Sequence, residues 1–380
     1  MNKEPAIVDL FCGCGGFGLG AELAGFKSIA AVDIESTLQS AYARNFPKAQ
    51  VVNGDLSKME AEDWRMLLNG QQVDGVIGGP PCQGYSRMGH SDKADPRRSL
   101  LKHFFRTVNI ISPKFFVMEN VEGLMDEKNV YELRSALKVI DKSYTVLNPM
   151  IVNAHDYGAP TKRKRVIVVG YKPEYLARLD VADFIPTNVE RNTVRDAIYD
   201  LPSPIYATQL PDADDYAWNK YRKVSGLSNY ALAMRELPPQ NLGWDVSVRE
   251  LKNQRVSGFL NTKHTEAVLN RYALVEQGLV DKTSRAKRLS WDGVCPTLRA
   301  GTGSDKGSHQ AVRPLHPTEN RVITVREAAR LQGFPDWFVF HNTKWHSFRM
   351  IGNSVSPLVS KYILRTIKEK ILPKKLEKTG

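Results

Sequence analysis

The sequence predicts an α/β fold, in which helices flank a parallel sheet, together with a second, smaller domain. Over the first 170 residues, short apolar runs alternate with segments of helical pattern. The alternation weakens between residues 171 and 287, where prolines and aromatic residues gather, and it returns from residue 288. Alternating strands and helices are typical of parallel sheets, which bind ligands beyond the carboxyl ends of their strands.

The expected elements follow one another as strand and helix. The first strand, residues 6–11, leads through a glycine-rich loop, residues 12–20, into a helix that starts at residue 21. Further strands are expected at residues 28–33, 73–79 and 114–119, and further helices at residues 37–46, 325–332 and 356–370. Because the motifs described below follow these strands, we expect them to meet at one edge of the sheet.

Length and composition exclude several classes of protein. The chain has 380 residues, which is more than a single core of roughly 250 to 300 residues usually contains. No stretch approaches the ~18 apolar residues of a membrane span, and we expect neither a signal peptide nor a membrane partner. Four cysteines without paired C-x-x-C spacing predict no disulfide scaffold and no metal site. These features suit a protein of the reducing cytoplasm.

The charge of the chain indicates a polyanionic partner. Lys and Arg number 53 against 41 Asp and Glu, which gives a net charge of +12. A basic excess of this size favours nucleic acid, although an ordinary basic protein has the same composition.

The glycine-rich loop predicts a site for a nucleotide-like ligand. Glycines at Gly13 and Gly15 allow the backbone to turn tightly and to pass close to a ligand. Asp33 ends the next strand, where a carboxylate can accept hydrogen bonds from ribose hydroxyls, and Asp55 can accept from an adenine amino group. A glycine turn flanked by ordinary surface acids is the alternative.

Cys82 and Glu119 are the candidate reactive side chains. Cys82 lies on a loop of glycines and prolines after an expected strand, close in sequence to Arg97 and Arg98, which favours a reactive thiolate over a buried, inert cysteine. Glu119 ends another expected strand and can act as an acid on the same edge, unless it is an ordinary surface residue.

Together these motifs resemble those of the DNA (cytosine-5)-methyltransferases of the bacterial modification type. The similarity covers roughly residues 5–170 and 288–365, and five motifs occur in the order typical of that family. They are Asp9-Leu10-Phe11-x-Gly13-x-Gly15-Gly16, Pro80-Pro81-Cys82-Gln83, Glu119-Asn120-Val121, Arg163-x-Arg165 and Gly352-Asn353-Ser354-Val355. Two further stretches are similar to family sequences, namely Asp95-x-Arg97-x-x-Leu100 and the segment from Arg326 to Pro335.

The resemblance implies a Rossmann-like sheet that binds S-adenosylmethionine. It places the catalytic domain in residues 1–170 and 288–380 and a smaller target recognition domain in residues 171–287. The residues that it assigns to the cofactor are Phe11, Gly13, Gly15, Asp33, Ile34, Asp55, Leu56, Pro80, Leu100, Asn353, Ser354 and Val355.

The resemblance also implies a covalent mechanism. Cys82 adds to carbon-6 of cytosine, which activates carbon-5 for methyl transfer. Glu119 binds the nitrogen edge of the ring, Arg165 the carbonyl oxygen, and Asn120 orients the cysteine loop. Arg163 belongs to the same catalytic set through base-edge or phosphate contacts. The family commonly has Gln where this chain has Thr161, so any role of that Gln is in doubt here.

The partner implied is double-stranded DNA, from which the target cytosine is extruded. Phosphate contacts are expected from Arg97, Lys162, Lys164 and the basic stretch Lys282, Arg285, Lys287 and Arg288. We expect a monomer in the bacterial cytoplasm, and a cognate restriction endonuclease that forms no stable complex with it. Two alternatives remain at this point, a tRNA cytosine-5 methyltransferase and a catalytically silent DNA-binding homologue. A nicotinamide dehydrogenase is disfavoured by the glycine spacing.

Overall fold

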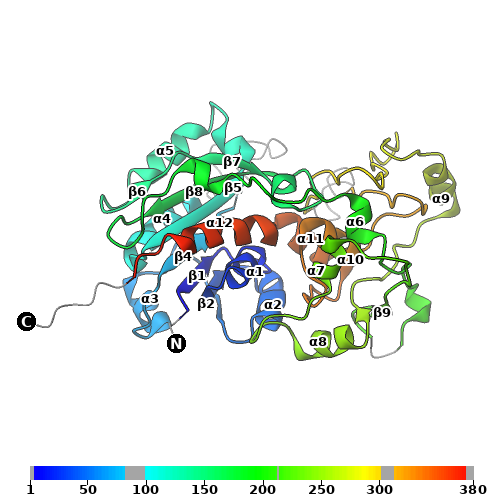
Figure 1. Cartoon of the computed structure of the whole chain (residues 1–380), viewed down its shortest axis with the longest axis horizontal. Helices are drawn as coiled ribbons and strands as arrows, with labels where there is room; N and C mark the ends of the chain where they lie inside the picture. The colour runs from blue at the N-terminus through cyan, green and yellow to red at the C-terminus, as the bar shows by residue number, and fades with distance from the viewer. Residues whose placement is uncertain (1–3, 82–98, 212–213, 301–311, 374–380) are drawn as a thin grey trace, which may run out of the picture.

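A computed structural model describes residues 4–81, 99–211, 214–300 and 312–373 (Figure 1). Within these residues an eight-stranded mixed sheet forms the centre of the molecule, with the strand order β3-β2-β1-β4-β5-β8-β6 and β7 paired with β8. Its strands are β1 (Ala6–Leu10), β2 (Lys27–Asp33), β3 (Gln50–Asn53), β4 (Gly75–Gly78), β5 (Phe115–Val121), β6 (Thr145–Val146), β7 (Met150–Asn153) and β8 (Lys164–Tyr171).

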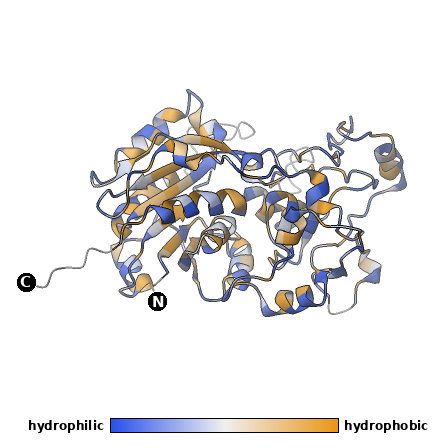
Figure 2. Ribbon diagram, in the orientation of Figure 1, coloured by the Kyte–Doolittle hydropathy of each residue, from blue (hydrophilic) through white to orange (hydrophobic). Residues whose placement is uncertain are grey.

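The sheet is parallel in one half and antiparallel in the other. Strands β1 to β5 pair in parallel, which confirms the expected α/β architecture. Strand β8 pairs antiparallel with β5, β6 and β7, which the sequence did not predict. Parallel strands buried on both faces show continuous apolar runs. β4 and most of β5 have this character, and β1 has it apart from the buried Asp9 (Figure 2).

Helices cover both faces of the sheet, and successive side chains of β1 contribute to different faces. Ile7 packs into the core that contains α1 (Gly16–Leu23) and α12 (Pro357–Glu369). Val8 packs into the core on the opposite face. The helices of that second face are α3 (Ala61–Leu68), α4 (Leu100–Ile111) and α5 (Val130–Leu137).

Helix α1 begins within the glycine-rich segment, earlier than the sequence predicted. Gly16, Gly18 and Gly20 lie in the helix, although glycine disfavours helices. A Cβ on Gly20 would lie 2.3 Å from the Cβ of Ser360, and one on Gly16 would lie 2.4 Å from the carbonyl oxygen of Val355. These glycines therefore allow α12 and the segment before it to pack directly against α1 (Figure 1).

The middle of the chain is built from short elements. It contains α6 (Val194–Ile198), β9 (Asn219–Lys220), α7 (Asn229–Met234), α8 (Asp245–Lys252), β10 (Arg255–Val256) and α9 (Glu266–Ala273). The chain then returns through α10 (Val325–Gln332), whose predicted bounds are confirmed, and α11 (Lys344–Asn353). Helix α2 (Ser36–Asn45) joins these elements in a shared apolar core that includes Leu38, Leu201, Leu289 and Leu331. This core contains residues from before residue 170, from the middle of the chain and from after residue 287. The division into domains at residues 170 and 287 stays a prediction.

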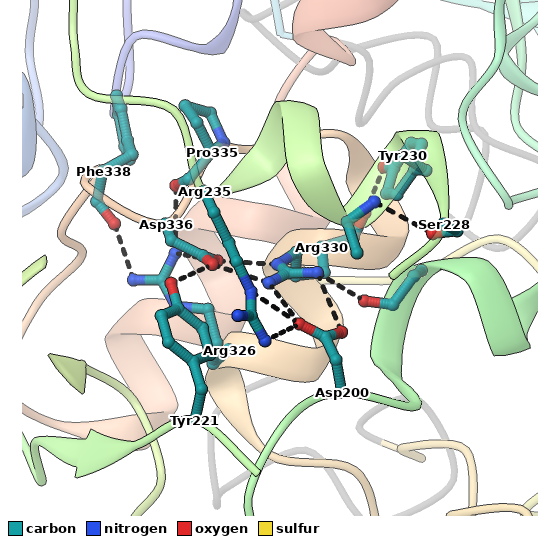
Figure 3. A network of polar contacts seen from close by, with 12 residues as sticks. Asp200, Tyr221, Ser228, Tyr230, Arg235, Arg326, Arg330, Pro335, Asp336 and Phe338 are labelled. Atoms are coloured by element: carbon teal, nitrogen blue, oxygen red, sulfur yellow. Dashed lines mark hydrogen bonds and ion pairs between the residues drawn. The ribbon is translucent and has the colours of Figure 1, made fainter. Parts of the chain in front are cut away.

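Buried charges fasten the middle segment to α10 (Figure 3). Arg330 is fully buried, and its guanidinium donates to Asp336 Oδ1 at 2.7 Å and to Asp200 Oδ1 at 3.2 Å. Asp200 also accepts from Arg235 Nε at 2.9 Å, and Asp336 accepts from the Tyr221 hydroxyl at 2.5 Å. Residues far apart in sequence are thus joined by a network whose centre, Arg330 with Asp200 and Asp336, is buried.

Four short 3-10 turns also occur among the described residues, namely η2 (Glu122–Met125), η3 (Ala154–Tyr157), η4 (Val181–Phe184) and η5 (Ala207–Gln209). Of these, η2 and η3 contact the sheet, η4 contacts α12 and η5 lies in the middle of the chain. None of the described helices combines the length and the apolar character that crossing a membrane requires.

Candidate active site

The loop after β1 faces open space at the carboxyl edge of the sheet. Phe11 and Gly13 have positive φ angles of 53° and 52°, so the backbone turns sharply at this point. A Cβ on Gly13 would meet no atom within 4 Å, whereas one on Gly15 would lie 2.6 Å from the ring of Phe46. Gly13 is therefore open to a ligand, and Gly15 is needed for packing against α2.

Asp33 links this loop to the end of β2. Its Oδ2 accepts a hydrogen bond from the Gly13 N–H at 2.8 Å, and its Oδ1 accepts from the Glu35 N–H at 2.9 Å. Burial raises the pKa of Asp33, and the two backbone N–H groups oppose this shift. The neighbouring Ile34 side chain is 64% exposed, which leaves an apolar surface beside the carboxylate.

The third edge residue, Asp55, is held by Ser57. Asp55 Oδ1 accepts from the Ser57 hydroxyl at 2.7 Å and from its N–H at 3.0 Å, and these hydrogen bonds lower the pKa of Asp55. Leu56 is buried, and its carbonyl oxygen accepts from Arg106. This arrangement fits an adenosine group. The two carboxylates can accept hydrogen bonds, the open glycine leaves room for the ligand, and the exposed apolar side chain can pack against a base.

Glu119 and Arg165 form an ion pair near the carboxyl end of β5. Arg165 Nε lies 2.7 Å from Glu119 Oε1, and both side chains are largely buried. The pairing of β5 with β8 produces this contact, because Val121 is the register partner of Arg165. A carboxylate beside a guanidinium can bind complementary donors and acceptors of a planar base.

Asn120 holds the start of the loop that follows β4. Its Nδ2 donates to the Pro80 carbonyl oxygen at 3.1 Å, and its Oδ1 accepts from the Val121 N–H at 2.9 Å. A Cβ on Gly79 would lie 3.2 Å from Glu119 Oε2, so Gly79 lies directly beside Glu119. Cys82 comes two residues after Pro80 but lies outside the described residues, as do Asp95, Arg97 and Arg98.

The segment after α11 reaches the glycine-rich loop from the other end of the chain. The Ser354 hydroxyl lies 3.0 Å from the Cys14 thiol, and Val355 is buried against Gly16. Asn353 is exposed at the end of α11, and Leu100 is half-buried at the start of α4. The predicted cofactor residues from both ends of the chain thus lie around one edge of the sheet, apart from Leu100, for which the structure gives no contact there.

The described cysteines are poor nucleophiles. Burial raises the pKa of Cys14 to about 12, and it raises the pKa of Cys12 and Cys295 as well. All three are buried and stay protonated at neutral pH. These three cysteines do not fit the role of nucleophile, and Cys82 stays the predicted one.

Arg163 is placed differently from the expectation. It is only 2% exposed, and its terminal nitrogens donate to the carbonyl oxygens of Leu298 at 3.1 Å and Gly352 at 2.9 Å. This placement does not fit the base-edge or phosphate contact that the sequence suggested. Arg288 likewise is buried and donates to the carbonyl oxygens of Tyr272, His316 and Glu319, so it does not fit a phosphate contact.

One contact near the site was not foreseen. Arg349 of α11 forms two hydrogen bonds of 2.9 Å with the carboxylate of Glu35, two residues beyond Asp33. Glu35 could have been noticed from its position after Asp33, but its partner lies 314 residues away in sequence. The pair joins the β2–α2 turn to the helix that ends at Asn353. In the described part of the chain, no group of three or more His, Cys, Asp or Glu side chains could hold a metal ion.

Comparisons with known proteins show the family of the chain. The family model for C-5 cytosine-specific DNA methylase matches residues 6–369. The chain is 40% identical to the Type II methyltransferase M.XorII of Xanthomonas oryzae, over 99% of this chain and 87% of the relative. It is 31% identical to the Type II methyltransferase M.DdeI of Desulfomicrobium norvegicum, over 95% of this chain and 88% of that relative.

Solved structures extend the similarity to the fold. A prophage-encoded protein of E. coli, whose crystal structure is titled as that of a DNA modification methyltransferase, superposes with a TM-score of 0.85 at 41% identity, over 96% of this chain and 99% of that one. The Dnmt2 methyltransferase of S. pombe shares the fold, with a TM-score of 0.60 at 18% identity over 96% of this chain and 98% of that one. The family match spans the main sheet, the middle segment and α12. The chain therefore belongs to the C-5 cytosine-specific DNA methylase family.

Proposed function

We propose that this enzyme transfers a methyl group from S-adenosylmethionine to carbon-5 of a cytosine that is extruded from a specific duplex sequence. The observation that carries the proposal is the Glu119–Arg165 ion pair, 2.7 Å apart, close to Gly79, which precedes Cys82 by three residues in sequence. A nucleophilic thiol and a base-binding pair are the two parts that covalent activation of a pyrimidine requires.

In this mechanism the side chains of the chain act on the pyrimidine ring. The Cys82 thiolate forms a bond to carbon-6, and the ring electrons move toward carbon-5. Glu119 binds the nitrogen edge of the ring and holds a proton there, while Arg165 donates to the carbonyl oxygen as negative charge develops. S-adenosylmethionine, when bound, supplies the electrophilic methyl group. Loss of the carbon-5 proton to solvent and expulsion of Cys82 restore the aromatic ring.

The residues proposed for the cofactor are those around the open side of Gly13. Asp33 would accept from the ribose hydroxyls, Ile34 would cover the adenine, and Asp55 would accept from its amino group. Asn353 to Val355 would lie beside the methionine end. This assignment is supported by the exposed Ile34 face and by the space above Gly13.

The proposed substrate is duplex DNA, and the proposed role is modification in a restriction system. The net charge of +12 favours a polyanion, and the exposed Lys162 and Lys164 flank the Arg163-x-Arg165 motif. The relatives at 40% and 31% identity are named as Type II methyltransferases, which supports the role in protection of DNA. We propose that the enzyme acts as a monomer, which suits extrusion of a single base. The cognate endonuclease would recognise the same DNA sequence and would form no stable complex with the enzyme.

The decisive experiment follows the methyl group. Purified protein is incubated with methyl-labelled S-adenosylmethionine and either mixed-sequence duplex DNA or tRNA, and the DNA product is sequenced after bisulfite treatment. We expect label in DNA only, with methylcytosine within one short recurring sequence. Label confined to tRNA, or no label in either nucleic acid, would contradict the proposal.

A further inference from the structure

Arg163 stands where three segments of the chain meet. One is the turn before β8, to which Arg163 itself belongs. The second is a strap, residues 295–300, whose Leu298 carbonyl oxygen accepts from Arg163 Nη1 at 3.1 Å. The third is the end of α11, whose Gly352 carbonyl oxygen accepts from Arg163 Nη2 at 2.9 Å. The strap and the end of α11 lie 135 and 189 residues away from Arg163 in sequence.

The strap is fixed against the turn by backbone hydrogen bonds. The Lys162 N–H donates to the Cys295 carbonyl oxygen at 2.8 Å, and the Cys295 N–H donates to the Pro160 carbonyl oxygen at 2.9 Å. The Thr161 hydroxyl adds a bond of 3.3 Å to the Cys295 carbonyl oxygen. Thr161, which stands where the family commonly has Gln, therefore has a structural partner in this chain.

The strap also presses against Gly352 on its other side. A Cβ on Gly352 would lie 2.2 Å from the Ala300 nitrogen and 2.4 Å from the Arg299 carbonyl carbon. Because both contacts are to backbone atoms, a side chain at residue 352 would have to move the strap or the end of α11. The strap is thus held between the turn and Gly352, with the Arg163 guanidinium bridging both sides.

Both proposed ligand sites adjoin this junction. Arg165, two residues after Arg163, pairs with Glu119 in the proposed base site. Asn353, directly after Gly352, begins the segment proposed for the methionine end of the cofactor. A displacement at Arg163 therefore changes the spacing between the two sites.

We infer that Arg163 is a positioning residue, which sets the distance between the base-binding pair and the methyl donor and contacts neither the base nor the DNA backbone. The inference rests on the proposed function, because it gives the junction a role in that reaction. A planar guanidinium presents diverging donors to two carbonyl groups in fixed directions, whereas a lysine ammonium is a flexible point charge. The site thus requires arginine rather than any cation.

The test compares Arg163→Lys with Arg288→Lys. Both arginines are buried and donate to backbone carbonyl oxygens, but Arg288 bonds to residues 272, 316 and 319, none of which is proposed to bind the cofactor. Each variant is measured for S-adenosylmethionine affinity without DNA, for thermal unfolding, and for kcat and the KM for DNA.

For Arg163→Lys we expect the Kd for S-adenosylmethionine to rise about tenfold, since one of two charge-assisted hydrogen bonds is lost. We expect kcat to fall about 10- to 100-fold through misplacement of the reacting groups, with the KM for DNA changed less than about twofold. Arg288→Lys should lose comparable thermal stability and leave the Kd unchanged.

A second variant reaches the same junction without touching Arg163. Gly352→Ala should raise the Kd for S-adenosylmethionine in the same way, and the two substitutions combined should give less than the product of their separate effects. A higher KM for DNA with an unchanged Kd in Arg163→Lys would place Arg163 on the DNA and overturn the inference. Equal Kd values in the Arg163 and Arg288 variants would overturn it too. Wild-type protein that binds the cofactor but methylates no DNA would count against the proposed function alone.

Discussion

The cofactor edge of the main sheet and the middle segment are held in place by different interactions. At the edge, several positions are fixed by backbone groups, such as the Gly13 N–H bound to Asp33, and the pair of Glu35 with Arg349 adds a contact to the end of the chain. In the middle segment, positions depend on buried charges that join distant parts of the chain, such as Arg330 with Asp200. The turn at Gly13 follows from a glycine motif in the sequence, whereas no sequence pattern predicted the pairing of Arg330 with Asp200.

The largest expected effect concerns the chemistry at the edge alone. Replacing the proposed nucleophile by Cys82→Ala should abolish methyl transfer, because carbon-6 then has no covalent partner. Methyl transfer is measured by incorporation of label into duplex DNA, and binding of S-adenosylmethionine by calorimetry. Binding should stay within about twofold of wild type, since no proposed cofactor residue is changed. Transfer at the wild-type rate would remove the covalent mechanism.

The next effect addresses the buried charges of the middle segment. Arg330→Met should lower the free energy of unfolding by about 3 to 5 kcal/mol, because Asp336 and Asp200 lose a fully buried partner. Arg235→Met is the matched control, since that side chain is 16% exposed and Asp200 keeps its bond to Arg330. Urea unfolding of both variants gives the comparison. Equal losses in the two variants would show that Arg330 is not the centre of the network.

A smaller effect is expected from the acid at the edge. Glu119→Gln should lower kcat on the order of 100-fold, as the loss of a general acid or base typically does. Glu122→Gln, three residues later, changes a carboxylate that pairs with the exposed Lys164 at 3.5 Å and should leave kcat within about twofold. Single-turnover rates on labelled DNA separate the chemical step from product release. An unchanged rate for Glu119→Gln would limit Glu119 to a structural role.

The smallest expected effect is a difference between the two regions in how stability depends on pH. Burial raises the pKa of Asp9 in β1 well above its ordinary value, whereas the charge of Arg330, acting against burial, lowers the pKa of Asp336. The native state therefore binds a proton at Asp9 that the unfolded chain releases, and stability from this group falls as pH rises toward its native pKa. Stability from Asp336 is instead lost as pH falls below the ordinary pKa of an aspartate.

This contrast predicts opposite outcomes for two substitutions. Asp9→Asn should increase the free energy of unfolding more at pH 8 than at pH 5, by about 1 kcal/mol or more, because the cost of keeping a neutral carboxyl disappears. Asp336→Asn should be destabilising at both values of pH. Urea unfolding at pH 5 and pH 8 measures both variants. A gain from Asp9→Asn that is independent of pH would show that Asp9 is ionised in the native protein.

Sequence patterns predicted the parts of the fold that local physics determines. The approximate strand ends, the turn at Gly13 and the span of α10 follow from apolar runs, glycine geometry and a helical pattern. The start of α1 was wrong, because its glycines serve packing against Ser360 rather than chain reversal. Arg163 was interpreted from its motif alone, whereas its partners lie on the strap and on α11. Contacts over such sequence distances depend on tertiary structure.

The packing of α12 against α1 has a consequence for synthesis of the protein. During translation, β1 and α1 leave the ribosome long before residues 353–369, whose side chains cover α1 and approach its glycine-rich loop. Domains generally fold as units during synthesis, so this edge stays incomplete while the last segment is still within the ribosome. A chain interrupted before residue 353 therefore lacks the residues that pack against α1 and its glycine-rich loop, and we expect such a chain to methylate no DNA.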